Sequence, residues 1–169
     1  MSDPPHESLA ERAVRLAVDN VAAGGKPFAC IVVDAGTGEV LAEATNQVTQ
    51  RGDPTAHGEI EAIRQVAARG RSDLAGCEVY VTAYPCPMCL GALYYAQPEK
   101  VFFAATRQQE GEYYEDGTRY MSLGTFYDEY AKPTGERSLP THQAVVADAA
   151  APFRAYAQAH PNSRPPSAR

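Results

Sequence analysis

Two short motifs that must meet in space constrain this chain more than any other feature of its sequence. One places a histidine and a glutamate two positions apart, His57 and Glu59, and the other is a Cys-x-x-Cys pair, Cys86 and Cys89. Two cysteines at this spacing lie within one helical turn, so both sulfurs can bind one metal ion. Structural zinc normally has four protein ligands, whereas catalytic zinc keeps three and leaves one position for water. The sequence therefore predicts a catalytic zinc site with His57, Cys86 and Cys89 as ligands.

Both motifs are predicted to lie at helix starts. His57 opens a helix expected over residues 56–69, and Cys86 precedes a helix expected over residues 87–96. A proline suits the first turn of the second helix, where its missing N–H costs least. The partial positive charge at a helix N-terminus favours thiolate over thiol. At such a start, the side chains of His57 and Glu59 can diverge enough for one to hold the metal and the other the metal's water.

The cysteine pair alone also fits other kinds of site. A Cys-x-x-Cys motif can be a redox pair or one half of a structural zinc site. A structural site needs a fourth ligand, and the remaining histidines are His6, His142 and His160. Only His142 lies away from the loose ends of the chain, in a predicted loop. The three-ligand site is therefore the main interpretation, and the four-ligand site is its alternative.

Further residues give the chain a family resemblance. His-x-Glu followed by Pro-Cys-x-x-Cys is the signature of zinc-dependent nucleobase deaminases. The chain resembles the cytidine deaminase-like superfamily over nearly its whole length, and within it the bacterial guanine deaminases. The segments that carry this resemblance are 27–28 (Pro-Phe), 46–49 (Asn-Gln-Val-Thr), 53–59 (Asp-Pro-Thr-Ala-His-Gly-Glu), 85–92 (Pro-Cys-Pro-Met-Cys-Leu-Gly-Ala) and a late segment, 132–156, which runs from Lys-Pro through Phe-Arg-Ala-Tyr. The chain departs from the family at Gly58, where alanine is usual, and at Tyr84, where glutamate is usual.

The resemblance implies a zinc-dependent hydrolytic deaminase with one Zn²⁺ per chain. Its first candidate reaction converts guanine to xanthine and ammonia, which makes the enzyme a hydrolase of C–N bonds in cyclic amidines. Zinc lowers the pKa of a bound water toward neutrality. Glu59 then acts as the catalytic acid and base: it takes the proton of the water, passes it to a ring nitrogen, and protonates the departing amine.

The resemblance, together with the two departures, also indicates a set of substrate contacts. These predicted residues are Phe28, Asn46, Tyr84, Glu115, Asp116 and Tyr156. The amide of Asn46 both donates and accepts, which suits a purine edge, and Phe28 offers a ring for stacking. The alternatives are a turn asparagine, a core phenylalanine, a solvated loop at Glu115 and Asp116, and simple helix packing at Tyr156.

The order of predicted elements indicates an α/β protein with a mixed sheet. With the resemblance, this becomes a three-layer α-β-α sandwich with a five-stranded mixed sheet, of the cytidine deaminase-like kind. Strands are predicted over residues 28–34, 39–45, 77–83, 101–105 and 143–146. Two further helices are predicted over residues 8–23 and 152–159. The implied organisation is a flexible leader over 1–7, one deaminase domain over 8–160, and a disordered tail over 161–169.

The composition of the chain limits the kinds of molecule that it is expected to bind. The chain has 169 residues and a net charge of −6, without a basic run or an apolar stretch long enough to span a bilayer. We expect a small-molecule substrate, no membrane, no nucleic acid and a cytoplasmic location. Cys30 and Cys77 are expected to be buried thiols rather than a disulfide. The segment around Tyr156 resembles one that crosses to the partner in a domain-swapped homodimer, so a homodimer is expected.

Three other functions compete with guanine deamination. The substrate could be another aminopurine, a pyrimidine, a pterin, a triazine or a nucleoside, because Gly58 and Tyr84 both lie beside the predicted metal site. A tRNA adenosine deaminase shares the motifs, but the acidic charge of the chain argues against it. The third is a catalytically silent zinc-binding protein, against which the presence of Glu59 argues.

Overall fold

The computed structural model describes residues 8–115, 117–120, 122 and 124–161. The chain divides into two compact units, Met1–Tyr127 and Asp128–Arg169, and each is described here by itself. The predicted leader, all but the first residue of the predicted tail, and Asp116 lie outside the described residues. No helix within the described ranges is long and apolar enough to cross a membrane.

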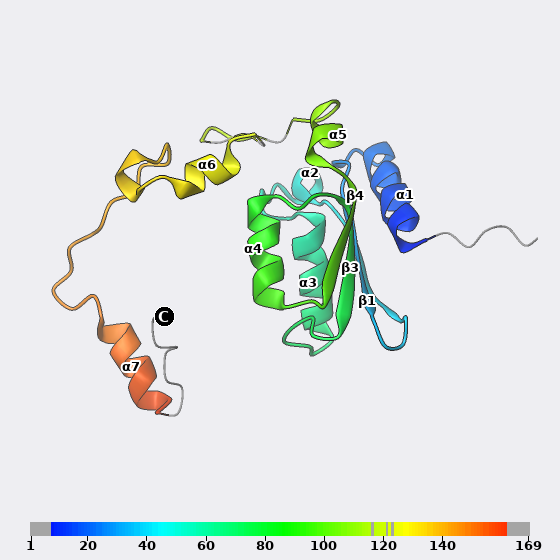
Figure 1. Ribbon diagram of the computed structural model, residues 1–169. Helices are drawn as coiled ribbons and strands as arrows, with labels where there is room; N and C mark the ends of the chain where they lie inside the picture. Colours follow the sequence, from blue (N-terminus) through cyan, green and yellow to red (C-terminus); the bar gives the residue numbers. More distant parts are fainter. Residues whose placement is uncertain (1–7, 116, 121, 123, 162–169) are drawn as a thin grey trace, which may run out of the picture. The chain divides into compact units, whose positions relative to one another are not determined.

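A mixed sheet forms the centre of the first unit (Figure 1). In order across the sheet, its strands are β2 (Val40–Thr45), β1 (Ala29–Asp34), β3 (Cys77–Ala83) and β4 (Lys100–Ala105). β1 is antiparallel to β2 and β3, whereas β3 and β4 are parallel. A parallel pair needs a crossover connection, and helix α4 (Pro87–Ala96) provides it. Four of the predicted strands are thereby confirmed to within a residue.

Helices cover both faces of this sheet. α1 (Leu9–Ala22) packs on one face, and α3 (Gly58–Ala68) and α4 pack on the other (Figure 1). Neighbouring residues of a strand point to opposite faces. In β1, Ile31 accordingly joins the cluster beneath α1, while Val32 joins the larger core shared with α3 and α4. The first unit therefore has the predicted three layers.

The first helix is fixed at both of its ends. Ser8 and Glu11 form a capping box, in which Glu11 accepts the Ser8 N–H at 2.7 Å and the Ser8 hydroxyl accepts the Glu11 N–H at 3.2 Å. After α1, Gly24 takes a left-handed conformation with φ 86°, which glycine adopts without a Cβ penalty. The helix therefore stops at a defined point, and the chain turns directly into β1.

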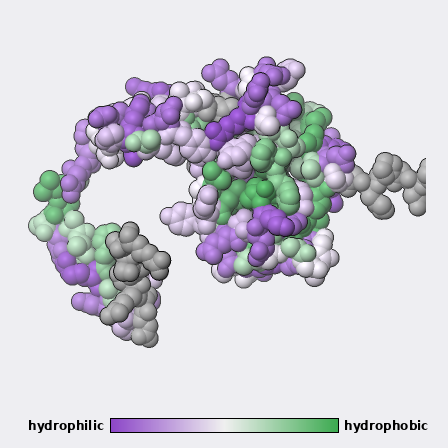
Figure 2. All heavy atoms as spheres, in the orientation of Figure 1, coloured by the Kyte–Doolittle hydropathy of each residue, from purple (hydrophilic) through white to green (hydrophobic). Residues whose placement is uncertain are grey.

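The prediction of a fifth strand over residues 143–146 is wrong. These residues form no strand in the described structure, and Val145 is 95% exposed. A β-branched sequence favours a strand only where a neighbouring edge accepts its hydrogen bonds. The sheet has four strands, and its edge strand β4 leaves Phe102 and Phe103 more than 40% exposed. Figure 2 shows hydrophobic residues gathered over the region of α4 and β4.

The second unit consists mainly of short elements. It contains a 3-10 helix (Thr134–Glu136) and α7 (Ala151–Ala159), which confirms the predicted C-terminal helix. Glu129 accepts hydrogen bonds from the backbone of Ser138 and from Lys132, so one carboxylate fixes the bend between them.

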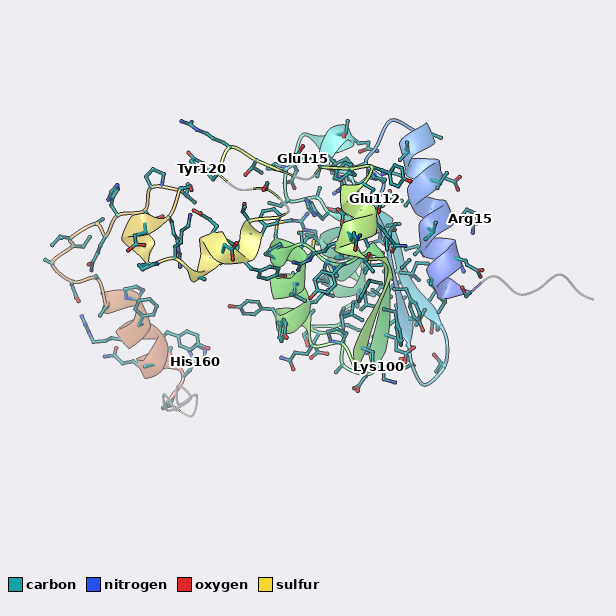
Figure 3. The ribbon with its side chains drawn as sticks, turned by 45° about the horizontal axis from the view of Figure 1, so that its top comes forward. Arg15, Lys100, Glu112, Glu115, Tyr120 and His160 are labelled. Carbon is teal, nitrogen blue, oxygen red and sulfur yellow. The ribbon has the colours of Figure 1, made fainter. Side chains whose placement is uncertain are left out.

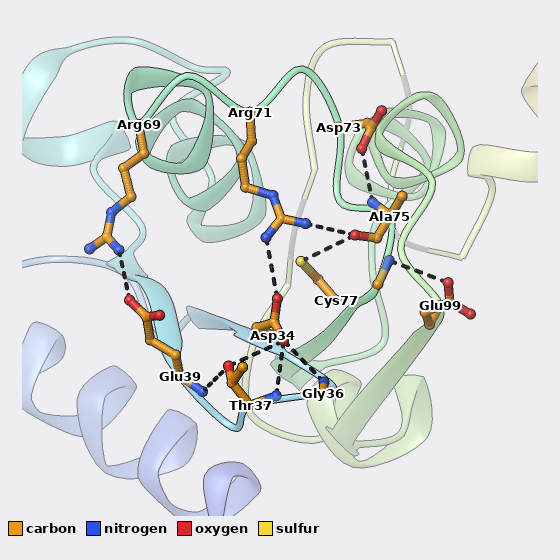
Figure 4. Close-up of polar contacts among 11 residues, drawn as sticks. Asp34, Gly36, Thr37, Glu39, Arg69, Arg71, Asp73, Ala75, Cys77 and Glu99 are labelled. Atoms are coloured by element: carbon orange, nitrogen blue, oxygen red, sulfur yellow. Dashed lines mark hydrogen bonds and ion pairs between the residues drawn. The ribbon is translucent and has the colours of Figure 1, made fainter.

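The sheet of the first unit has two distinct ends. Lys100 begins β4 at one end, and Glu115 follows the chain's exit from the other end (Figure 3). At the Lys100 end, Asp34 accepts hydrogen bonds from the N–H groups of Gly36 and Thr37, both at 3.0 Å. Arg71 lies 3.5 Å from the same carboxylate and also donates to a backbone carbonyl at 2.7 Å (Figure 4). We call this end the polar turn end.

Candidate metal centre

The three predicted zinc ligands lie together at the opposite end of the sheet. The ligand atoms of His57, Cys86 and Cys89 all lie within 4.8 Å of one another. The Cys86 Sγ is 3.6 Å from the His57 Nδ1. His57 is the N-cap of α3 and Cys86 is the N-cap of α4, each with extended backbone. The structure therefore brings together two helix starts, as the sequence predicted.

Local packing explains why these two helix starts meet. The proline that follows Cys86 occupies the first helical position of α4, where its fixed φ suits the helix. At the start of α3, a Cβ on Gly58 would lie 3.3 Å from backbone atoms of Ala29. The first turn of α3 therefore approaches the backbone of β1 closely, and Gly58 faces that strand.

The environment separates the two thiols chemically. The pKa of Cys86 is lowered to about 4, first because Cys89 donates a hydrogen bond to its sulfur and then because His57 lies beside it. The pKa of Cys89 is raised, since its S–H makes that hydrogen bond and its side chain is buried. Negative charge at this site is therefore concentrated on the Cys86 sulfur, which suits it to bind a cation.

Glu59 lies beside this cluster in the first turn of α3. Its side chain is buried, with 8% of the residue exposed. Burial raises the pKa of Glu59, because an ionised carboxylate loses its hydration there, and the nearby Cys86 raises it further. Glu59 is thus a carboxyl group that can gain and lose a proton closer to neutral pH than an exposed glutamate can.

The donor set fits zinc. One imidazole nitrogen and two sulfurs are ligands that Zn²⁺ prefers, and three protein ligands leave one position open. The thiolate character of Cys86 is what metal binding requires. His142, the alternative fourth ligand, lies in the second unit on an exposed segment without helix or strand. The three-ligand interpretation therefore accounts for the group found here.

A pocket of about 280 Å³ opens next to these ligands. Its volume is of the order needed to hold a single heterocyclic ring. Its lining residues come from five segments of the first unit: Lys26, Val48, Pro54, His57, Cys86, Pro87, Met88, Gly117, Thr118 and Phe126. Gly117, Thr118 and Phe126 belong to the aperiodic region after β4, so that region contributes to the pocket wall.

Asn46 comes two positions before the pocket residue Val48 and is almost fully buried, with 1% of the residue exposed. Its Oδ1 accepts the N–H of Val48 at 3.1 Å, which is the local turn predicted as the alternative. Its Nδ2 is also buried and has no hydrogen-bond partner among the described residues. A buried donor without an acceptor costs free energy, so this N–H group has a hydrogen bond still to make.

Neither Phe28 nor Tyr84, both predicted to contact the substrate, is among the residues that line this pocket. Phe28 contacts the ring of Tyr114 edge to face, with ring centroids 5.1 Å apart. The ring of Tyr84 packs against Phe103 at 5.2 Å and lies beneath the Arg107 guanidinium at 4.4 Å. Tyr84 is therefore held by β4 and the following segment, and it is not among the residues that line the pocket.

The remaining predicted substrate residues are less informative. Glu115 is exposed and lines two other surface pockets of the first unit. Asp116 lies outside the described residues. Tyr156 lies in the second unit, where it is 59% exposed and stacks on His160 with ring centroids 4.2 Å apart. The structure therefore does not bring Glu115 into the pocket beside His57.

Sequence reasoning missed several wall residues and the short helices near them. α2 (Val48–Arg51) and α5 (Arg107–Gly111) were not predicted, because helices this short carry no clear periodicity. A signal for α5 was present: Thr106 and Gln109 form a capping box. For Lys26, in the loop before β1, and for Val48, the first residue of α2, the sequence held no signal of a place in the pocket wall.

Comparison with known proteins agrees with this geometry. Residues 4–105, more than half of the chain, match the model of the cytidine and deoxycytidylate deaminase zinc-binding region. The chain therefore belongs to this family of zinc-binding deaminases.

Individual members of the family differ in how much of this chain they match. Guanine deaminase of Bacillus subtilis (strain 168) is 40% identical over 153 residues, which cover 89% of this chain and 93% of that protein. The X-ray structure of guanine deaminase from Bacillus subtilis matches with a TM-score of 0.82 at 37% identity, over 96% of this chain and 99% of that one. A tRNA-specific adenosine deaminase of Aquifex aeolicus (strain VF5) is 42% identical over 89 residues, or 52% of this chain and 58% of that protein.

Proposed function

We propose that this protein is a zinc-dependent aminohydrolase that converts guanine to xanthine and ammonia. The observation that carries the proposal is the meeting of His57, Cys86 and Cys89 beside a small pocket, with the buried Glu59 next to them. The similarity to guanine deaminase of Bacillus subtilis extends over most of both chains and supports guanine as the substrate.

In this proposal, His57, Cys86 and Cys89 hold the zinc ion. Bound zinc supplies Lewis-acid chemistry, which makes water a nucleophile near neutral pH. The thiolate of Cys86 and the imidazole of His57 fix the position of the ion at the two helix starts. The helix dipoles of α3 and α4 favour the negative charge of the sulfurs there.

Glu59 is the proton carrier of the proposed reaction. Its raised pKa suits a group that must both accept and donate a proton during one cycle. Its carboxylate accepts a proton from the attacking water and gives it to the ring nitrogen beside the reacting carbon. It then takes the second proton, from the hydroxyl now bonded to that carbon, and gives it to the amine, so that ammonia leaves and a carbonyl remains. Burial of Glu59 keeps bulk water from competing for this proton.

We propose that the substrate ring is bound by Asn46 and Phe28. The unpartnered Nδ2 of Asn46 would donate to an acceptor on the purine, since its Oδ1 is already held by Val48. Phe28 would offer a ring face or edge to the base. Glu115 and Asp116 are kept as further contacts only if the segment after β4 folds over the substrate, and Tyr84 acts through Arg107 rather than by contact.

We further propose a homodimer in which the C-terminal segment of each chain, including Tyr156, completes the site of its partner. The apolar edge strand β4 supports this, because exposed edges of this kind pair with another strand. Light scattering and activity measured across a dilution series test this arrangement. A strict monomer with full activity at nanomolar concentration would exclude the homodimer.

An ammonia-release screen of the zinc-loaded protein tests the substrate. The panel is guanine, guanosine, cytosine, adenine, a pterin and an aminotriazine, and guanine is expected to be turned over fastest. Turnover of another ring without turnover of guanine would exclude guanine as the substrate but would leave the assignment as a deaminase intact. Salt-sensitive RNA binding would instead favour the tRNA alternative. Failure of every ring and of RNA, with zinc bound, would favour a catalytically silent protein.

A further inference from the structure

We propose that Asn20, on helix α1, is a positioning residue that fixes the side-chain amide of Asn46 for substrate binding. This inference rests on the proposed function only in assigning a substrate to Asn46. Helix α1 contributes no residue to the lining of the pocket beside the metal centre. The role of Asn20 is therefore exerted through the loops that it holds.

Asn20 connects two loops that are far apart in the sequence. Its Nδ2 donates to the carbonyl of Lys26 at 2.8 Å and to the carbonyl of Asn46 at 2.9 Å. Its Oδ1 accepts from Nε2 of Gln50 at 3.2 Å. Asn20 is buried, with 6% of the residue exposed, and uses both donors and its acceptor. A single side chain thus joins the loop before β1 to the loop after β2.

Both of these loops carry pocket residues. Lys26 lines the pocket itself, and Val48, two positions after Asn46, lines it as well. Val48 also donates its backbone N–H to the Oδ1 of Asn46 at 3.1 Å. Holding the Asn46 carbonyl therefore holds the turn that orients the Asn46 amide. The chain of contacts runs from Asn20 to the Asn46 backbone, then to Val48 and the Asn46 side chain.

The space around Asn20 is fitted to this network. A Cβ placed on Gly25 would collide with Nδ2 of Asn20 and with Nε2 of Gln50. The backbone N–H of Gly25 also donates to the carbonyl of Asn20 at 2.8 Å. A side chain at position 25 would push the amide of Asn20 away from its two carbonyl partners. Gly25 and Asn20 therefore form one arrangement, in which the glycine makes room for the amide.

Asn20→Asp tests the proposal with little change of shape. The substitution removes both N–H donors and places an oxygen opposite the two carbonyl oxygens, while an acceptor for Gln50 remains. Hydrogen exchange of the zinc-loaded protein reports on the turn directly, because the Val48 N–H is bonded to Asn46. We expect this N–H to exchange about tenfold faster, because the loss of one hydrogen bond makes local opening of the turn easier. Val18→Ala, on an exposed position of the same helix, is the control and should leave this exchange unchanged.

Kinetics separate positioning from a general loss of fold. We expect Asn20→Asp to raise KM for guanine about tenfold with a much smaller change in kcat, since a binding contact is weakened. In an Asn46→Ala background, adding Asn20→Asp should raise KM by less than about twofold, because coupled residues are not additive. Gly25→Ala should likewise quicken the exchange of the Val48 N–H and raise KM, because its added methyl group displaces the amide of Asn20.

Several outcomes would overturn the proposal. One is unchanged Val48 exchange and unchanged KM in both Asn20→Asp and Gly25→Ala. Another is an equal KM effect of Asn20→Asp with and without Asn46. If the unaltered protein releases no ammonia from guanine, the proposed function fails, whereas Val48 exchange still decides whether Asn20 positions Asn46. If Asn20→Asp does not fold, the rate of Val48 N–H exchange and the KM for guanine in Gly25→Ala decide whether the proposal holds.

Discussion

The two ends of the central sheet treat their polar side chains in opposite ways. At the polar turn end, the carboxylate of Asp34 is met by two backbone N–H groups and by Arg71 (Figure 4). At the metal-centre end, the Nδ2 of Asn46 has no partner among the described residues, and three ligand atoms crowd together. At the polar turn end, the polar groups described here bond to one another, and these bonds stabilise the fold. In the proposed function, the other end binds the zinc ion and the substrate.

The same difference appears in two carboxyl groups. Hydrogen bonds from Thr37 lower the pKa of Asp34, so that it stays ionised. Burial raises the pKa of Glu59, so that it holds its proton more readily than an exposed glutamate does. Local structure thus holds one acid in a turn by hydrogen bonds and gives the other a raised pKa, which fits the proposed proton transfer by Glu59.

Cys86→Ala should produce the largest contrast between the two ends. Removing one of three ligands should cost most of the bound zinc and, with it, turnover. The matched control is Cys77→Ala, a buried cysteine at the polar turn end, which should keep its zinc. Metal analysis of the purified variants measures both. Full zinc content in Cys86→Ala would remove Cys86 from the ligand set.

Glu59→Gln should come next in size. The amide keeps the shape of the side chain but cannot exchange a proton, so turnover should fall at least ~10²-fold, the lower end for a general acid–base group. Zinc content and the melting temperature should be maintained. The control is Glu99→Gln, whose carboxylate accepts from Gly76 at the polar turn end. Near-normal turnover by Glu59→Gln would end its catalytic assignment.

Asp34→Ala should act on stability and not on the reaction. Because the pKa of Asp34 is lowered by folding, its stabilising effect is complete above the unfolded pKa and is lost as pH falls through the lower folded value. The variant should therefore melt a few degrees below the unaltered protein at neutral pH, and the gap should close below about pH 4. Turnover at neutral pH should be unchanged. A pH-independent gap would mean that the charge of Asp34 is not the cause.

Gly58→Ala should have the smallest effect. A methyl group there meets the backbone of Ala29 at 3.3 Å, which opposes the gain in helix propensity of about 0.5–1 kcal/mol. The free energy of unfolding should therefore change by less than about 1 kcal/mol. Substrate preference should stay the same, since Gly58 faces β1. A changed order of substrates in the ammonia-release screen would instead connect Gly58 to the pocket.

The parts of the site that follow from local chemistry were predictable from the sequence. The spacing of Cys86 and Cys89 within one turn and the position of His57 before a helix brought the ligands together as expected. Tyr84 was ambiguous, because a residue next to a ligand can point either way along a strand end. Its ring packs on Phe103 and Arg107, which only the register of β3 with β4 determines.

Long-range pairing was the part that sequence could not supply. The segment over residues 143–146 has the composition of a strand, yet it is exposed and unpaired in the described chain. Whether such a segment forms a strand depends on an available edge, which the residues themselves do not encode. The buried network around Asn20 was invisible for the same reason, since Asn20 and Asn46 lie 26 positions apart.

The metal centre also has a consequence for the unfolded chain. His57 and Cys86 are separated by 29 positions and belong to two different helices. An ion held by both closes this stretch into a loop, as a covalent cross-link would, and lowers the entropy that the chain gains on unfolding. Since the ion binds the folded arrangement more tightly than the open chain, it adds to stability by an amount that rises with the logarithm of its affinity. Besides their proposed part in the reaction, the zinc ligands therefore link the first half of the sheet-forming sequence to the second half and stabilise the folded chain.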